Sequence, residues 1–118
     1  MARILVVDDE PAIRTLVGRV LERHGHQVIL CQGSGEALAA DPPIDLLLVD
    51  HMLPGMTGLE IAEHLRRRWP NLPVVLMSGY PPQPDTMPGP PSSFLQKPML
   101  PSAVVKAVES LLKETTST

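Results

Sequence analysis

The sequence predicts an α/β domain built around a parallel β-sheet. Short aliphatic runs alternate along the chain with longer segments in which apolar side chains recur every three or four residues. Continuous aliphatic runs are typical of strands buried on both faces, and the periodic segments are typical of amphipathic helices. Because strands alternate with helices, right-handed crossovers would leave all the strands parallel.

The size and composition indicate a single globular domain. The 118 residues suffice for one hydrophobic core, and the content of 43% hydrophobic and 19% charged residues is that of a folded globule. The net charge of −3 gives no bulk attraction to nucleic acid or anionic lipid, and no apolar run suits a membrane span or a signal peptide. We therefore expect a cytoplasmic domain at residues 1–113, followed by a frayed polar tail at residues 114–118.

The first predicted unit is a strand, an acidic loop and a helix. Residues 3–7 form an aliphatic strand that ends at Asp8 and Asp9, and Pro11 suits the first turn of the following helix. Gly25 is expected to end that helix in the left-handed conformation.

The remaining elements continue the alternation. Ser34 is expected to cap a short second helix, and the lone Cys31 is interpreted as a small core side chain of the second strand. We expect the later strands at residues 26–31, 46–49, 74–77 and 94–96, and the later helices at residues 34–40, 58–69 and 101–113.

Polar residues follow four of the five expected strands. Asp8 and Asp9 follow the first strand, Asp50 the third, Ser78 the fourth and Lys97 the fifth. Taken singly, each has an ordinary interpretation as a helix cap, a turn residue or a solvated lysine. However, the carboxyl ends of parallel strands meet at one edge, where open α/β sheets form their sites. Their coincidence at this edge therefore predicts a functional site.

These residue types suit phosphoryl transfer. Three neighbouring carboxylates repel one another unless a cation joins them, and Mg²⁺ prefers such oxygen ligands. One carboxylate can then act as a nucleophile toward phosphorus. An ammonium and a hydroxyl group can stabilise the charge on the transferred phosphoryl group.

Four segments resemble those of response-regulator receiver domains, the phosphoacceptor domains of two-component signalling systems. They are residues 4–10, 48–58, 77–80 and 95–98, which occur in the order of the family, and the match as a whole extends over nearly the entire chain. The resemblance implies a flavodoxin-like doubly wound (βα)5 sandwich with strand order 2-1-3-4-5. It also implies phosphorylation by a histidine kinase or a phosphotransfer protein, and an output through switched partner binding. From the net charge and the lack of an apolar span we expect no direct contact with nucleic acid or membranes.

The resemblance assigns roles to the acidic positions. Asp50 matches the phosphoacceptor, Asp9 the acid that binds Mg²⁺ directly, and Asp8 the acid that acts largely through water. The backbone carbonyl of Met52 matches the third protein ligand of the metal.

The same resemblance assigns the switch and the positioning residues. Ser78 matches the hydroxyl group that turns toward the phosphoryl group, and Lys97 matches the lysine that pairs with it. Phe94 matches the aromatic switch position, and the peptide bond before Pro98 is expected to be cis.

Two features depart from the family pattern. Met52 and Tyr80 match the positions that tune hydrolysis of the acyl phosphate, and their bulk predicts slow self-hydrolysis. Six of the chain's 14 prolines fall between Pro81 and Pro91, and proline inside a helix costs about 3 kcal/mol. The family's fourth helix is therefore expected to be absent or reduced to one turn, and the proline-rich segment itself is our hypothesis for the element that shifts on phosphorylation.

Other functions remain open at the level of sequence. The chain can be a phosphorylation-independent interaction module, or the receiver segment of a hybrid sensor histidine kinase. An aspartyl phosphatase would usually carry an Asp-x-Asp pattern after the first strand, and a flavin-binding domain would carry a hydroxyl- and glycine-rich loop there. This chain has Asp8-Asp9-Glu10 at that place. We therefore expect a domain that is no enzyme beyond its own phosphorylation and dephosphorylation.

Overall fold

The computed structural model describes residues 2–116, which form one five-stranded parallel sheet in the order β2-β1-β3-β4-β5. This order and the parallel sheet confirm the expected fold class. The described elements are β1 (Arg3–Val7), α1 (Pro11–Arg23), β2 (Gln27–Cys31), α2 (Ser34–Leu38), β3 (Leu46–Asp50), α3 (Gly58–Arg68), β4 (Val74–Ser78), β5 (Ser92–Gln96) and α4 (Pro101–Thr116).

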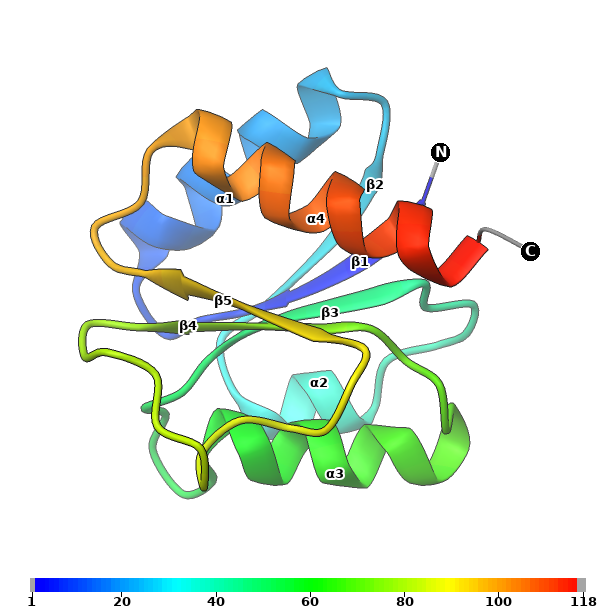
Figure 1. The fold of residues 1–118 in the computed structure, drawn as a ribbon, viewed down its shortest axis with the longest axis vertical. Coiled ribbons are helices and arrows are strands. Elements are labelled where there is room, and N and C mark those ends of the chain that lie inside the picture. Colours follow the sequence, from blue (N-terminus) through cyan, green and yellow to red (C-terminus); the bar gives the residue numbers. More distant parts are fainter. Residues whose placement is uncertain (1, 117–118) are drawn as a thin grey trace.

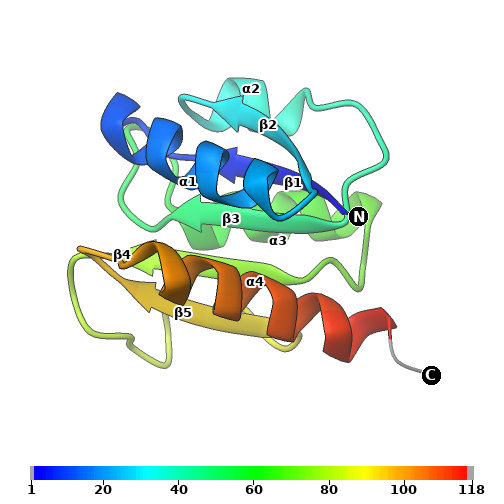
Figure 2. The same cartoon turned by 90° about the horizontal axis from the view of Figure 1, so that it is seen from above.

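The helices cover the sheet in two layers. Helices α1 and α4 lie on one face and α2 and α3 on the other (Figures 1 and 2). Alternate residues of β1 point into the two layers: Ile4 and Val6 join the core beneath α1 and α4, whereas Leu5 and Val7 join the core above α2 and α3. The aliphatic runs are therefore buried on both sides, as parallel strands require. Within residues 2–116 no helix is both long and apolar enough to cross a lipid bilayer.

Several expected boundaries were wrong. Ser34 is the first residue of α2 rather than its cap, because extended Gly33 occupies the N-cap position. Helix α2 ends at Leu38, short of the expected residue 40, close to the prolines that follow Asp41. Strand β2 begins one residue late, at Gln27. Gly25 does adopt a positive φ of 87° behind α1, as expected.

Two other elements are longer than expected. Strand β5 begins at Ser92 because its backbone pairs with β4 from Val74 onward, a contact that its polar side chains do not reveal. Helix α4 continues to Thr116, since no glycine or proline interrupts it and the Thr115 hydroxyl donates to the Leu112 carbonyl. Residues 114–116 are therefore helical rather than frayed, and residues 117–118 lie outside the described range.

The proline-rich segment between β4 and β5 contains no helix, so the fourth helix of the family pattern is absent. The segment runs along the α2/α3 face (Figure 1), where Met87 packs on the core and Pro88 is buried. The Arg66 guanidinium donates from Nη1 to the Gly89 carbonyl (2.6 Å) and from Nη2 to the Pro91 carbonyl (2.9 Å). It also donates to the Leu72 carbonyl from Nε and Nη2. One side chain thus fixes the second half of the segment.

We expect Arg66→Ala to destabilise the fold by about 1–2 kcal/mol, because several charge-assisted hydrogen bonds are lost at once. Amide exchange should quicken at residues 83–93, which a urea titration and hydrogen-exchange measurements would show together. Arg67→Ala is the control, because Arg67 is exposed on the same turn. Equal behaviour of the two variants would contradict this role for Arg66.

Candidate acidic site at the carboxyl edge of the sheet

Three carboxylates meet at the carboxyl edge of the sheet. Asp8 and Asp9 follow β1, and Asp50 is the last residue of β3; one carboxylate oxygen of each lies within 4.8 Å of the others. Asp8 is fully buried and Asp50 is 5% exposed, whereas Asp9 is exposed. The parallel pairing of β1 with β3 brings these acids together. This is the convergence that the sequence predicted.

Lys97 reaches the same cluster from the end of β5. Its Nζ lies 2.8 Å from Asp8 Oδ2, 3.4 Å from Asp50 Oδ2 and 3.2 Å from Glu10 Oε1. The Lys97 backbone N–H donates to the Ser78 carbonyl at 2.7 Å, which fixes the start of the loop after β5. The peptide bond between Lys97 and Pro98 is cis, as the resemblance implied.

The charges of the cluster shift two pKa values. Burial raises the pKa of Asp50 above its ordinary value, the Asp8 charge raises it further, and Lys97 offsets part of the effect. Burial acts to lower the pKa of Lys97, but its contact with Asp8 and the charges of Asp50 and Asp8 outweigh burial and raise it to about 12. Asp50 therefore remains short of positive charge, even with Lys97 beside it.

The donor set fits a small divalent cation. Asp8 Oδ1 accepts the Glu10 backbone N–H at 2.8 Å, whereas Oδ2 is buried and accepts no hydrogen bond. Lys97 Nζ is close to that oxygen, so the contact is an ion pair without hydrogen-bond geometry. An oxygen-only set with two buried carboxylates suits Mg²⁺, which binds through few carboxylates and retains water.

The loop after β3 is held by its junction with α3. Thr57 caps α3 in a capping box with Glu60, and Met52 forms a bridge with Thr57. The Gly58 backbone N–H donates to the His51 carbonyl at 2.9 Å. Met52, whose carbonyl is expected to bind the metal, therefore lies in a closed loop directly beyond Asp50.

The expected switch residues lie beside this loop. Ser78 is 4% exposed, and its Oγ accepts the Tyr80 backbone N–H at 3.1 Å. Phe94 is partly buried against the α2/α3 core. The Met52 and Tyr80 side chains are 61% and 71% exposed, and both residues line one small cavity with Ser78 and Phe94. The structure thus brings the expected switch residues and the expected hydrolysis-tuning residues together around one cavity, beside the loop that follows Asp50.

The sequence interpretation missed two residues of the site. Glu10 pairs with Lys97, and Arg14 Nη1 donates to the Asp8 carbonyl at 2.7 Å, which ties α1 to the end of β1. The run Asp8-Asp9-Glu10 was a signal for Glu10, whereas no motif in the sequence marked Arg14.

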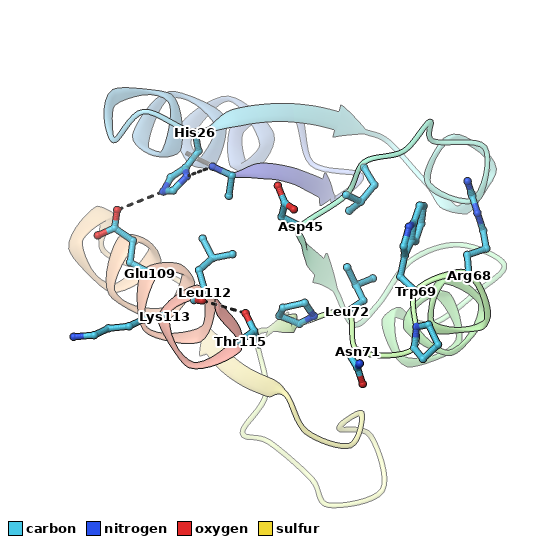
Figure 3. A pocket seen from close by; sticks show the side chains of 14 residues that line it. His26, Asp45, Arg68, Trp69, Asn71, Leu72, Glu109, Leu112, Lys113 and Thr115 are labelled. Atoms are coloured by element: carbon cyan, nitrogen blue, oxygen red, sulfur yellow. Dashed lines mark hydrogen bonds and ion pairs between the residues drawn. The ribbon is translucent and has the colours of Figure 1, made fainter. Parts of the chain in front are cut away.

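A sizeable hollow lies elsewhere. It measures about 660 Å³ and lies at the amino ends of the strands (Figure 3), where Ala2, Asp45 and Pro73 precede β1, β3 and β4. Its wall includes His26, whose ring accepts the Ala2 N–H at 3.2 Å and lies 3.4 Å from Glu109. None of the residues predicted for the site lines it. The buried acids and the paired lysine therefore identify the site better than cavity size does.

Known proteins share both the sequence and the fold. The family model described as the response regulator receiver domain matches residues 4–109. The chain is 31% identical to Protein PilH of Pseudomonas aeruginosa, covering 95% of this chain and 98% of that protein. It is 32% identical to the phosphate regulon transcriptional regulatory protein PhoB of Escherichia coli, covering 94% of this chain but only 52% of PhoB. The chain thus spans about half the length of that regulator.

Solved structures give the same result. A CheY-like response regulator receiver domain protein from Methanospirillum hungatei superposes with a TM-score of 0.85 at 28% identity, covering 97% of this chain and 95% of that one. The receiver domain of the hybrid histidine kinase CckA superposes with a TM-score of 0.80 at 30% identity, covering 93% and 98%. Taken with the parallel sheet and its acidic edge, these matches show that the chain belongs to the response-regulator receiver domain family.

Proposed function

We propose that Asp50 accepts a phosphoryl group from the phosphohistidine of a histidine kinase or of a phosphotransfer protein, in a reaction that requires Mg²⁺. The observation that carries the proposal is the convergence of three carboxylates within 4.8 Å, with Lys97 Nζ only 3.4 Å from Asp50 Oδ2. If Asp50 had only a structural role, it would need no neighbouring carboxylates whose negative charge Lys97 neutralises only in part.

Each residue of the site has a separate role in the phosphoryl transfer. A carboxylate oxygen of Asp50 attacks phosphorus, the bond from phosphorus to the donor imidazole breaks, and the imidazole departs with its electron pair. Lys97 and Ser78 would bind oxygens of the transferred group. Mg²⁺, when bound to Asp9, to the Met52 carbonyl and to Asp50, with Asp8 acting largely through water, would neutralise charge on those oxygens.

In dephosphorylation a water molecule attacks phosphorus, the bond from phosphorus to the Asp50 oxygen breaks, and the carboxylate and inorganic phosphate are released. We propose that Met52 and Tyr80 slow this step, because their bulky side chains line one cavity beside the loop after Asp50 and would shield the phosphoryl group from water. Apart from this self-phosphorylation and self-dephosphorylation, the domain has no catalytic role in our proposal.

The output is a change of partner. We propose that Ser78 and Phe94 shift when Asp50 is phosphorylated, and that the proline-rich segment moves with them. Residues 80–85 are exposed, whereas the part from Met87 onward is fixed by core packing and by Arg66. The domain would act in the cytoplasm. The receiver unit, predicted at residues 1–113, would continue to the end of α4 at Thr116. Amide exchange at residues 80–93 that stays the same on phosphorylation would refute the movement of the segment.

The test of the phosphorylation proposal uses a small acyl-phosphate donor. With Mg²⁺ present, intact mass spectrometry should show one added phosphoryl group, and a chelator should abolish it because the acids would lose their neutralising cation. Readdition of Mg²⁺ should restore the label. A protein that stays unmodified with several donors despite bound Mg²⁺, or one that is labelled equally well in chelator, would refute the proposal.

A further inference from the structure

His51 carries a buried ring nitrogen without a partner. Among residues 2–116 its Nδ1 is one of two fully buried side-chain nitrogen or oxygen atoms that have no hydrogen bond, and the other, Asp8 Oδ2, has Lys97 beside it. Buried polar atoms are nearly always paired, so an unpaired one indicates either an unseen water or a second state in which the atom is used. His51 also follows Asp50 directly in the chain.

The sheet places His51 beside Ser78. Asp50 pairs with Met77, so the next residue of each strand is His51 on one side and Ser78 on the other. The His51 backbone N–H continues the pairing by donating to the Met77 carbonyl at 2.8 Å. Neighbouring strands lie about 4.8 Å apart. The two backbones are therefore close at this point.

Alternation along the strands places the two side chains on one face. Val49 and Leu76 both point into the α2/α3 core, and His51 and Ser78 stand two residues beyond them. Because side chains in strands repeat with a period of two, His51 and Ser78 share that face. Both residues line a single cavity of about 130 Å³, which Phe94 also borders.

The Ser78 hydroxyl has a proton to donate. Its oxygen accepts the Tyr80 N–H at 3.1 Å, and within the described chain no acceptor for the hydroxyl proton is found. A hydroxyl proton without an acceptor and a ring nitrogen without a partner thus belong to two residues that line the same small cavity. The Asp50 carboxylate lies on the opposite face of its strand from His51, since side chains alternate.

We propose that His51 is a positioning residue that holds the Ser78 hydroxyl away from Asp50 in the unphosphorylated domain. Its Nδ1 accepts the hydroxyl proton directly, after a rotation of Ser78. An oxygen of the phosphoryl group on Asp50 then competes for the same proton. This inference rests on the proposed function, since it sets the balance between the two states of that site.

Two substitutions separate the hydrogen bond from the shape of the side chain. His51→Phe keeps a planar ring and removes the acceptor, whereas His51→Asn puts an amide oxygen where Nδ1 stands. Beryllofluoride with Mg²⁺ serves as the phosphoryl mimic, and its midpoint is followed by the amide NMR signals of Ser78 and Tyr80. We expect His51→Phe to bind the mimic about fivefold more tightly, the effect of one lost hydrogen bond in the competing state. His51→Asn should match the wild type.

A measurement on the wild-type ring needs no His51 variant. The ¹⁵N shift of His51 Nδ1 should be that of a hydrogen-bonded acceptor in the free domain, and it should change both in Ser78→Ala and on binding of the mimic. A shift that Ser78→Ala leaves unchanged overturns the inference, as does equal affinity of wild type and His51→Phe. If the wild type binds no mimic, the proposed function fails, and the ring shift of the free domain still decides whether His51 holds Ser78.

Discussion

Asp50→Asn is expected to abolish phosphorylation while leaving the domain folded. The amide of asparagine is no nucleophile toward phosphorus, so the added mass seen with the wild type should not appear. The fold should survive because Lys97 keeps two partners, Asp8 at 2.8 Å and Glu10 at 3.2 Å. Removal of the ammonium group in Lys97→Met would instead leave the buried carboxylates of Asp8 and Asp50 without a positive partner. This variant should therefore destabilise the fold.

Asp50→Asn should also be more stable than the wild type at neutral pH when no metal is present. The pKa of Asp50 is raised in the folded state, chiefly by burial and then by Asp8. A raised carboxyl pKa means that its stabilising contribution is complete below the unfolded-state value of about 3.9 and is lost as the pH rises through the folded-state value. Asparagine does not titrate. The advantage of Asp50→Asn should therefore grow as the pH rises from about 4 and then level off.

Urea titrations of both proteins across this pH range in chelator would measure the advantage. Added Mg²⁺ should reverse the order, because the metal stabilises only the protein that retains the full acidic cluster. Residual labelling of Asp50→Asn would show that another residue accepts the phosphoryl group. A stability difference that does not vary with pH would contradict the burial of a charged Asp50.

Gly58→Ala should cause a large loss of stability, because Gly58 has the tightest surroundings of the glycines. An added Cβ at Gly58 would lie 2.5 Å from the Asp50 carbonyl oxygen and 2.9 Å from Leu76 Cδ1. The first of these contacts is with backbone, which cannot rotate away, so the junction between β3 and α3 must shift. We expect a destabilisation of about 2–4 kcal/mol, at the upper end of overpacking effects. Because the strained atom belongs to Asp50, labelling by acyl phosphate should slow as well.

Gly35→Ala is the matched control for this substitution. Gly35 is also a helical glycine, but an added Cβ there meets nothing within 4 Å. Alanine favours a helix over glycine by about 1 kcal/mol, so this variant should be as stable as the wild type or more so. Similar thermal melting of the two variants would show that the contact of Gly58 with Asp50 does not constrain the site.

The sequence by itself determined the alternation of strands with helices and the acidic edge, because both follow from local patterns, whereas the strand order was implied only by the family resemblance. An aliphatic run identifies a buried strand, and the residue just after the run must lie at the carboxyl edge. Asp8, Asp50, Ser78 and Lys97 could therefore be placed together before any coordinates. The prolines between β4 and β5 also excluded a helix, since each lacks an amide hydrogen and clashes with the preceding turn.

Only the tertiary structure decided how distant segments hold one another. Arg66 binds the carbonyls of Gly89 and Pro91, more than 20 residues away, and no periodicity in the sequence marks an arginine for that contact. The early start of β5 at Ser92 likewise depends on its pairing with β4, not on its own polar residues. The register of β3 and β4, which puts His51 beside Ser78, is likewise set only by the pairing of the two strands. Local patterns encode which faces are apolar, whereas these contacts depend on the relative positions of whole elements, which packing alone sets.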